Sequence, residues 1–218
     1  MGYTHVMKQL YEKMMTFLSS ASEDFANLHH DYQMHVIGNF GRLYHSFENC
    51  YRSAKYFLPD NPSRVFSSFG RFVDLDNLED AYPDMCESLH KSDAIRSINE
   101  SMRKNWDAWR PIVFRLQLTE EEFIAIVAYL VWNLPGKSEP DDLVEIAERN
   151  KSAILHELHE YYKCIGLEDY SGRLGEILMF ISSINTLVSS YAELFEVFKL
   201  LDVIDEEAYL MAKISFNE

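Results

Sequence analysis

The chain has 218 residues, of which 47% are hydrophobic, and its 35 acidic and 20 basic side chains give a formal net charge of −15. This length and hydrophobic content are typical of one large globular domain that buries most of the surface of its unfolded chain. The charge argues against a nucleic-acid-binding surface, because such surfaces need clustered lysine and arginine to pair with phosphates. We therefore expect any contact with DNA to be made outside this chain.

The three cysteines are far apart in the sequence: Cys50, Cys86 and Cys164. None belongs to a Cys-x-x-Cys pair or has a histidine at zinc-ligand spacing, so we predict reduced thiols and no structural metal. No apolar run reaches the roughly 20 residues that a membrane-spanning helix needs, and the first residues are periodic and charged, unlike a signal peptide. These features predict an unsecreted protein that does not contact membranes.

Helical periodicity covers most of the chain. Val6, Leu10, Met14 and Phe17 recur at helical spacing and predict one face of a first helix. Between residues 62 and 83 the pattern is poor and predicts a short hairpin or a loop. The other expected helices, in chain order, span residues 31–57, 92–114, 123–132, 141–165 and 170–201, with a last short helix within 205–214.

Two helix ends are marked by local chemistry. The turn cluster Pro59-Asp60-Asn61-Pro62 stops the helix that begins at residue 31. Thr119 is followed by Glu120, Glu121 and Glu122, which predicts a helix N-cap with an acidic first turn. The helix at 123–132 is apolar on nearly every face, so we expect protein around it and an all-α fold with three helical layers.

One segment resembles a known family. Phe25 and Leu28, followed by Gln33, Val36 and Ile37, have the spacing of the signature F-x-x-L-x-x-x-D-Q-x-x-L-L of nuclear hormone receptor ligand-binding domains. Tyr32 stands at the Asp position of that signature, and Asp31 precedes it. Residues 39–53 are similar to receptors of the divergent branch that is expanded in nematodes.

The order of later segments extends the resemblance. The apolar segment 122–133 matches a family helix in length and pattern, and residues 172–179 are similar to the opening of the family's tenth helix. Residues 209–214 stand where the family has its terminal activation helix. The resemblance thus runs from about Phe17 to Ile214.

The resemblance implies a three-layer antiparallel helical sandwich over residues 1–218, in a nuclear transcription factor whose zinc-finger DNA-binding domain is not in this chain. It implies a non-enzymatic domain that needs no cofactor and binds a small apolar ligand such as a fatty acid or sterol. With 13 Tyr and 14 Phe, the alternative is a ligand-independent scaffold whose pocket is filled by its own side chains. The expected pocket-lining residues are Leu10, Met14, Phe17, Phe47, Cys50, Tyr51, Leu187, Tyr191 and Leu194.

The family's coactivator helix binds between a lysine near the end of helix 3 and a glutamate in the last helix. Ser20 and Ala212 stand at these positions here, so we expect weak coactivator binding, while corepressor helices stay plausible partners because apolar anchors dominate helix-in-groove recognition. The expected groove residues are Ser20, Gln33, Ile37, Leu210, Met211 and Ala212. The family's homodimers and heterodimers use the outer face of helix 10, which here carries Ser182, Asn185, Ser189, Glu193 and Glu196.

The spacing of the histidines and acidic residues does not match catalytic or metal-binding motifs. His156 and His159 flank Glu157 but are three residues apart, whereas zinc-protease histidines are four apart on one helical face. The segment from Glu87 to His90 gives only one of the two Glu-x-x-His copies that a di-iron bundle needs. His29 and His30, with His35 nearby, could chelate a metal, but His29 and His30 point to different faces, and the resemblance places them in a connecting turn. We predict no catalytic residue and no metal ligand.

Overall fold

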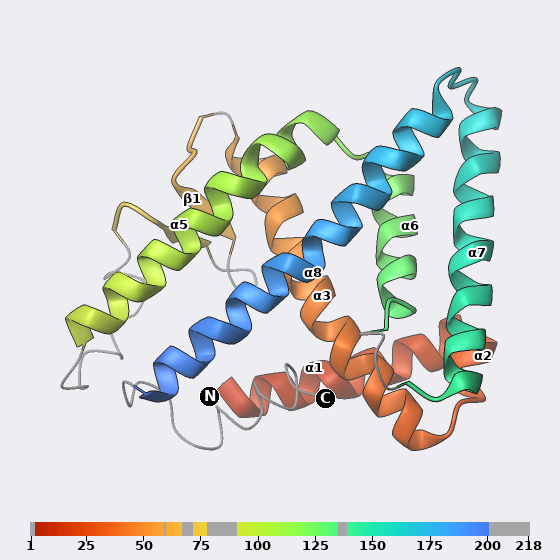
Figure 1. Cartoon of the computed structure of the whole chain (residues 1–218), viewed down its shortest axis with the longest axis horizontal. Coiled ribbons are helices and arrows are strands. Elements are labelled where there is room, and N and C mark those ends of the chain that lie inside the picture. Colours follow the sequence, from red (N-terminus) through yellow and green to blue (C-terminus); the bar gives the residue numbers. More distant parts are fainter. Residues whose placement is uncertain (1–2, 59, 67–71, 78–90, 135–138, 201–218) are drawn as a thin grey trace. The chain divides into compact units, whose positions relative to one another are not determined.

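A computed structural model of the chain describes residues 3–58, 60–66, 72–77, 91–134 and 139–200. These residues are helical apart from one small two-stranded sheet (Figure 1). The strands, β1 Arg64–Phe66 and β2 Phe72–Asp74, are antiparallel, with Val65 opposite Val73. None of the described helices is long and apolar enough to span a membrane. The helices are α1 Tyr3–Ala21, α2 Glu23–Ala26, α3 His30–Phe57, α5 Lys91–Leu116, α6 Glu120–Val131, α7 Asp141–Cys164 and α8 Tyr170–Leu200.

The helices expected up to residue 201 are confirmed to within a few residues at each end. The poorly patterned segment 62–83 contains a hairpin, formed by β1 and β2. The four-residue helix α2 was not expected, because one turn is too short to show a hydrophobic period. The short helix expected within 205–214 lies outside the described residues.

The chain divides into two compact units. The first comprises Met1–Tyr44 and Leu118–Ile181, and the second comprises His45–Gln117 and Ser182–Glu218. Helices α3 and α8 therefore each contribute to both units. In the first unit, the largest fully buried side chains are Phe25, Ile37, Leu43, Ile126, Leu130, Leu143, Tyr162, Ile177 and Phe180.

The buried face of α1 differs from the expected one. Met14 and Leu18 are buried, whereas Phe17 is 63% exposed. Leu18 lies about 40° around the helix from Met14, and Phe17 lies about 60° away on the other side, so the apolar face turns toward Leu18. Helix α1 also runs close to α3, since a Cβ added at Gly41 would lie 3.1 Å from Cε1 of Tyr11.

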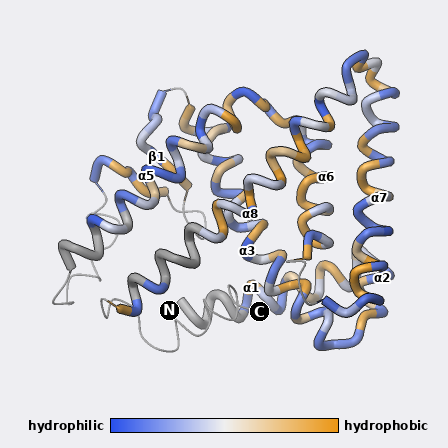
Figure 2. The backbone as a smooth tube through the Cα atoms, viewed as in Figure 1, coloured by the Kyte–Doolittle hydropathy of each residue, from blue (hydrophilic) through white to orange (hydrophobic). Residues whose placement is uncertain are grey.

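Helix α6 begins as its sequence predicts. The hydroxyl of Thr119 accepts a hydrogen bond from the backbone N–H of Glu122, and the Glu122 carboxylate accepts one from the backbone N–H of Thr119, which forms a capping box. The expectation that protein surrounds every face of α6 is wrong for Ile124, which is 64% exposed. Helix α7, by contrast, alternates hydrophobic and hydrophilic residues along its length (Figure 2), as expected for an amphipathic helix.

In the second unit, hydrogen bonds join the hairpin to two helices. The hydroxyl of Ser53 in α3 donates to the carbonyl of Asn49 and accepts from the backbone N–H of Phe66 at 2.7 Å. The indole N–H of Trp106 in α5 donates to the carbonyl of Pro62, just before β1, at 2.7 Å. The hairpin is therefore fixed to α3 and α5 by buried polar contacts as well as by its buried Val65 and Val73.

Candidate functional site

The signature segment forms the junction between α2 and α3 in the first unit. The side-chain amide of Gln33 donates to the carbonyl of Phe25 at 3.0 Å and to that of Ala26 at 3.4 Å, so it caps the end of α2. Ser22 caps the other end, because its hydroxyl accepts from the backbone N–H of Phe25. The four apolar residues of the signature are all buried: Phe25, Leu28, Val36 and Ile37. The signature is thus a structural unit that holds a single helical turn against α3.

Helix α2 is also bound to α7. The carboxylate of Asp24 accepts from Arg149 at 2.7 Å and from the side chain of Asn150 at 2.8 Å. The hydrogen bond from Arg149, followed by that from Asn150, holds the pKa of Asp24 below its usual value. These contacts fix the position of α2 from both sides.

A polar row on α3 holds the segment that follows α6. His35, Asn39 and Arg42 lie on one helical face, at spacings of four and three residues. His35 lies 2.9 Å from the buried carboxylate of Glu139, and the Asn39 side chain donates to the carbonyl of Asn133. Arg42 donates to Asn39 at 2.8 Å. Asn133 and Glu139 are therefore each bound to α3.

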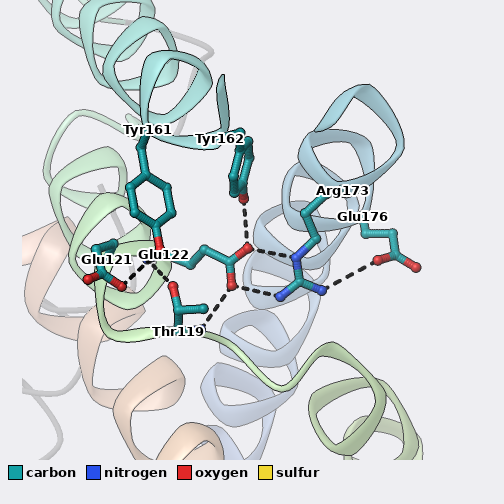
Figure 3. Close-up of polar contacts among 7 residues, drawn as sticks. All are labelled: Thr119, Glu121, Glu122, Tyr161, Tyr162, Arg173 and Glu176. Carbon is teal, nitrogen blue, oxygen red and sulfur yellow. Dashed lines mark hydrogen bonds and ion pairs between the residues drawn. The ribbon is translucent and has the colours of Figure 1, made fainter. Parts of the chain in front are cut away.

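Among the residues that the structure describes, the most buried carboxylate lies where α6, α7 and α8 meet (Figure 3). The side chain of Glu122 is 2% exposed, and its two carboxylate oxygens accept from Nε and Nη2 of Arg173 at 2.6 and 2.7 Å. The hydroxyl of Tyr162 donates to the same carboxylate at 2.7 Å. With the backbone N–H of Thr119 at 2.9 Å, the carboxylate has four donors.

Burial and hydrogen bonding have opposite effects on this carboxylate. Burial raises the pKa of Glu122, but the hydrogen bonds from Arg173, Thr119 and Tyr162 outweigh it, so the pKa is lower than usual. The pKa of Tyr162 is raised by burial and by its bond to Glu122. The pKa of Arg173 is raised by its hydrogen bond to Glu122. The cluster is a stable ion pair with no reactive nucleophile, and it joins three helices.

The expected groove residues have different surroundings. Ser20 is exposed near the end of α1 and its hydroxyl donates to the carbonyl of Phe17, at 2.7 Å. The Gln33 side chain donates to the carbonyl of Phe25 at the end of α2, and Ile37 is buried. Leu210, Met211 and Ala212 lie outside the described residues. Among the described side chains of the first unit, Phe17 in α1 and Met34 in α3 are large, apolar and exposed. Sequence reasoning did not assign Met34 to the groove.

The expected pocket residues are divided between the two units. In the first unit, Leu10 is half-buried, Met14 is buried and Phe17 is exposed. In the second unit, Phe47, Cys50 and Tyr51 share one face of α3, where Phe47 and Cys50 are buried, and Leu187 of α8 is also buried. Burial raises the pKa of the Cys50 thiol to about 12, so the thiol is protonated. The side chains of Tyr191 and Leu194 lie outside the described part.

Sequence reasoning missed the buried face of α5. Trp106, Trp109, Val113 and Leu116 are 2–5% exposed, and their helical spacing was available as a signal. The side-chain amide nitrogen of Asn105, beside this face, is buried without a hydrogen-bond partner.

Comparison with known proteins gives the family. The family model of the ligand-binding domain of nuclear hormone receptor matches residues 2–201. The chain belongs to this family. It is 24% identical, over 204 residues that cover 90% of the chain and 55% of the relative, to nuclear hormone receptor family member nhr-53 of Caenorhabditis elegans.

Other relatives are also nematode receptors. The chain is 24% identical to nuclear hormone receptor family member nhr-42 of Caenorhabditis elegans over 172 residues, which cover 78% of the chain and 47% of that relative. It is 25% identical to family member nhr-28 of Caenorhabditis briggsae over 192 residues, 84% of the chain and 42% of the relative. The chain thus spans about half the length of these receptors. The low identities fit a divergent nematode nuclear receptor. The helices of the described residues, with only a small two-stranded sheet, fit the all-α fold of the family.

Proposed function

We propose that this nuclear receptor domain binds a small apolar ligand, such as a fatty acid or sterol, and recruits coregulator helices in the nucleus. Residues 1–218 form one ligand-binding domain in this proposal. DNA contact belongs to a zinc-finger domain outside this chain, and a homodimer or heterodimer forms through the helix that the structure describes as α8. Nuclear hormone receptors are transcription factors and not enzymes.

The match to the family over residues 2–201 carries this proposal. The signature supports it, because its four apolar residues are buried and its glutamine caps α2. The signature is thus used as a folding element in this chain and is not a chance spacing of residues.

Coregulator recruitment is supported by exposed apolar side chains on the two helices that the resemblance assigns to the groove. Phe17 on α1 is 63% exposed and Met34 on α3 is 47% exposed. Large exposed apolar side chains are the anchors with which a groove binds an amphipathic helix. Ser20 supplies no positive charge there, so the groove depends on apolar contacts.

One observation favours the ligand-independent scaffold as a second candidate. In the second unit, Phe47, Trp106 and Trp109 are each at most 5% exposed. Bulky aromatic side chains of this kind fill space that a ligand would otherwise occupy. The two candidates differ in whether the domain holds a small molecule, and both act through protein partners.

A reporter experiment tests coregulator recruitment. The chain is fused to a heterologous DNA-binding domain, and transcription of a reporter gene is compared with that of the DNA-binding domain alone. We expect the chain to raise or lower reporter transcription, and we expect Met34→Glu to abolish this change. Val144→Glu is the matched control and should retain the change, because Val144 is an exposed apolar residue on α7, outside the proposed groove. An unshifted reporter, or equal loss in both variants, would contradict the proposed groove.

A further inference from the structure

Asn105 of α5 carries a buried polar atom that the protein does not satisfy. The side-chain nitrogen of Asn105 is buried and has no hydrogen-bond partner. The residue lies four positions before Trp109, on the same helical face. Trp106 and Trp109 are both 5% exposed, so this N–H group lies next to an apolar, water-poor face of the second unit.

The neighbouring polar groups of α5 are satisfied. The guanidinium of Arg103 donates to the side chain of Asn99, to the carbonyl of Leu75 and to the carboxylate of Asp76. The indole of Trp106 donates to the carbonyl of Pro62. The unsatisfied amide of Asn105 differs from these, and a buried donor without an acceptor typically costs about 1–3 kcal/mol of stability. A leucine of similar size would avoid that cost. The cost of the amide would be offset if a bound molecule accepted its hydrogen bond.

We propose that the side-chain N–H of Asn105 donates a hydrogen bond to an acceptor oxygen of the bound apolar ligand. This inference rests on the proposed ligand-binding function. It adds a ligand-orienting residue on α5 to the expected pocket residues of α3 and α8, Phe47, Cys50 and Leu187, which belong to the same unit. A mostly apolar site with a few placed polar groups is the usual form of a small-molecule pocket.

The acceptor is a neutral oxygen, such as that of a ketone or an ester. A buried carboxylate needs a positive partner. Of the two cations just before Asn105 on α5, Lys104 is exposed to solvent and Arg103 already pairs with Asp76. Asn105 contributes a neutral amide. The ligand class is therefore an apolar molecule with one uncharged acceptor group, which excludes an ionised fatty acid bound by its carboxylate at Asn105.

Three probes of equal chain length test this assignment: methyl hexadecanoate, hexadecanoate and hexadecane. Their binding to the wild-type domain and to Asn105→Leu is measured by tryptophan fluorescence, since Trp106 and Trp109 lie within one turn of Asn105. We expect the variant to bind methyl hexadecanoate about tenfold more weakly, the loss of one hydrogen bond, and hexadecane with unchanged affinity. The thermal midpoint of the ligand-free variant is expected to equal or exceed that of the wild type.

The other outcomes separate the inference from the function on which it rests. Equal binding of the ester by both proteins would overturn the role of Asn105 and leave the ligand-binding function standing. An equal loss for all three probes would assign Asn105 to packing and overturn the hydrogen bond. Tighter binding of hexadecanoate than of the ester, lost in the variant, would overturn the neutral acceptor. A wild-type domain that binds none of the probes would overturn this inference and count against the ligand-binding function.

Discussion

Glu122 is a charged side chain in the interior of the first unit, and its stability depends on its partners. The sequence predicts that Thr119 caps α6 and that an acidic residue follows in the first turn, because both signals are local. It does not predict the ion pair with Arg173, which lies 51 residues further along the chain. Only the packing of α6, α7 and α8 brings Arg173 and Tyr162 to the same carboxylate.

The Glu122–Arg173 pair should show strong coupling. Glu122→Leu removes the buried carboxylate from a guanidinium that is 19% exposed and that also pairs with Glu176 at 3.6 Å. We expect a loss of about 3–5 kcal/mol in the free energy of unfolding. The double variant with Arg173→Met should lose clearly less than the sum of the two single variants. Urea unfolding followed by circular dichroism measures the free energy of unfolding of each variant. Lys163→Met, which removes an exposed ion pair of α7, is the control and should have a small effect. Additive losses would contradict a buried, coupled pair.

At acid pH, Glu122 should no longer stabilise the folded domain. Its pKa in the folded state lies below the usual 4.5, so the unfolded chain binds the proton more readily. The stabilisation is therefore present above about pH 4.5 and is lost as pH falls through the lowered pKa. We expect the stability difference between wild type and Glu122→Gln to narrow from pH 6 to pH 3 in urea unfolding. If the stability difference between wild type and Glu122→Gln stayed constant from pH 6 to pH 3, the ionised carboxylate of Glu122 would not be the source of the stabilisation.

Among the elements, the long helices could be predicted and the short or packed features could not. Helix α3 was expected at 31–57 and spans His30–Phe57, since apolar spacing and a Pro-rich stop define it. Helix α2 has only four residues and depends on Ser22 and Gln33 for its caps. The exposure of Phe17 and of Ile124 follows from tertiary packing, which a helical period does not specify.

The two glycines of α3 should respond differently to alanine. Nothing lies within 4 Å of a Cβ at Gly38, whereas a Cβ at Gly41 would be 3.1 Å from the Tyr11 ring. Gly38→Ala should stabilise the domain by up to about 1 kcal/mol, because alanine favours a helix. Gly41→Ala gains the same helix preference, but the Tyr11 ring must move to make room for the new Cβ. The thermal midpoint of Gly41→Ala should therefore be lower than that of Gly38→Ala. Equal midpoints would contradict the close approach of α1 and α3.

At the scale of the whole molecule, the fold class and family could be predicted from the order of motifs along the chain. The order of Phe25 to Ile37, the apolar segment at 122–133 and Gly172 to Met179 is more specific than each motif alone. The functional site could not be predicted to the same depth. Helical spacing selected Phe47 and Cys50, which are buried. Sequence reasoning predicted the helix α5 but missed its buried face and the unsatisfied Asn105 beside it.

Coactivator binding should be weak. The resemblance places Ser20 where the family has a lysine near the end of helix 3, and the Ser20 hydroxyl donates to a carbonyl of its own helix. Each missing charge-assisted contact typically removes about 1.5–3 kcal/mol, or one to two decades of affinity. In a fluorescence-polarisation titration we expect Ser20→Lys to tighten binding of a leucine-rich coactivator peptide, with Ser19→Lys as the control. Submicromolar binding by the wild type would contradict this prediction.

The most direct test of the account is native mass spectrometry of the purified domain, followed by organic extraction and mass identification of what is released. We predict about one equivalent of an apolar small molecule with a neutral oxygen acceptor, which would establish a ligand-binding domain with an open pocket. A ligand-free mass that stays unchanged after incubation with a lipid library would contradict the account and favour the scaffold whose pocket is filled by its own side chains.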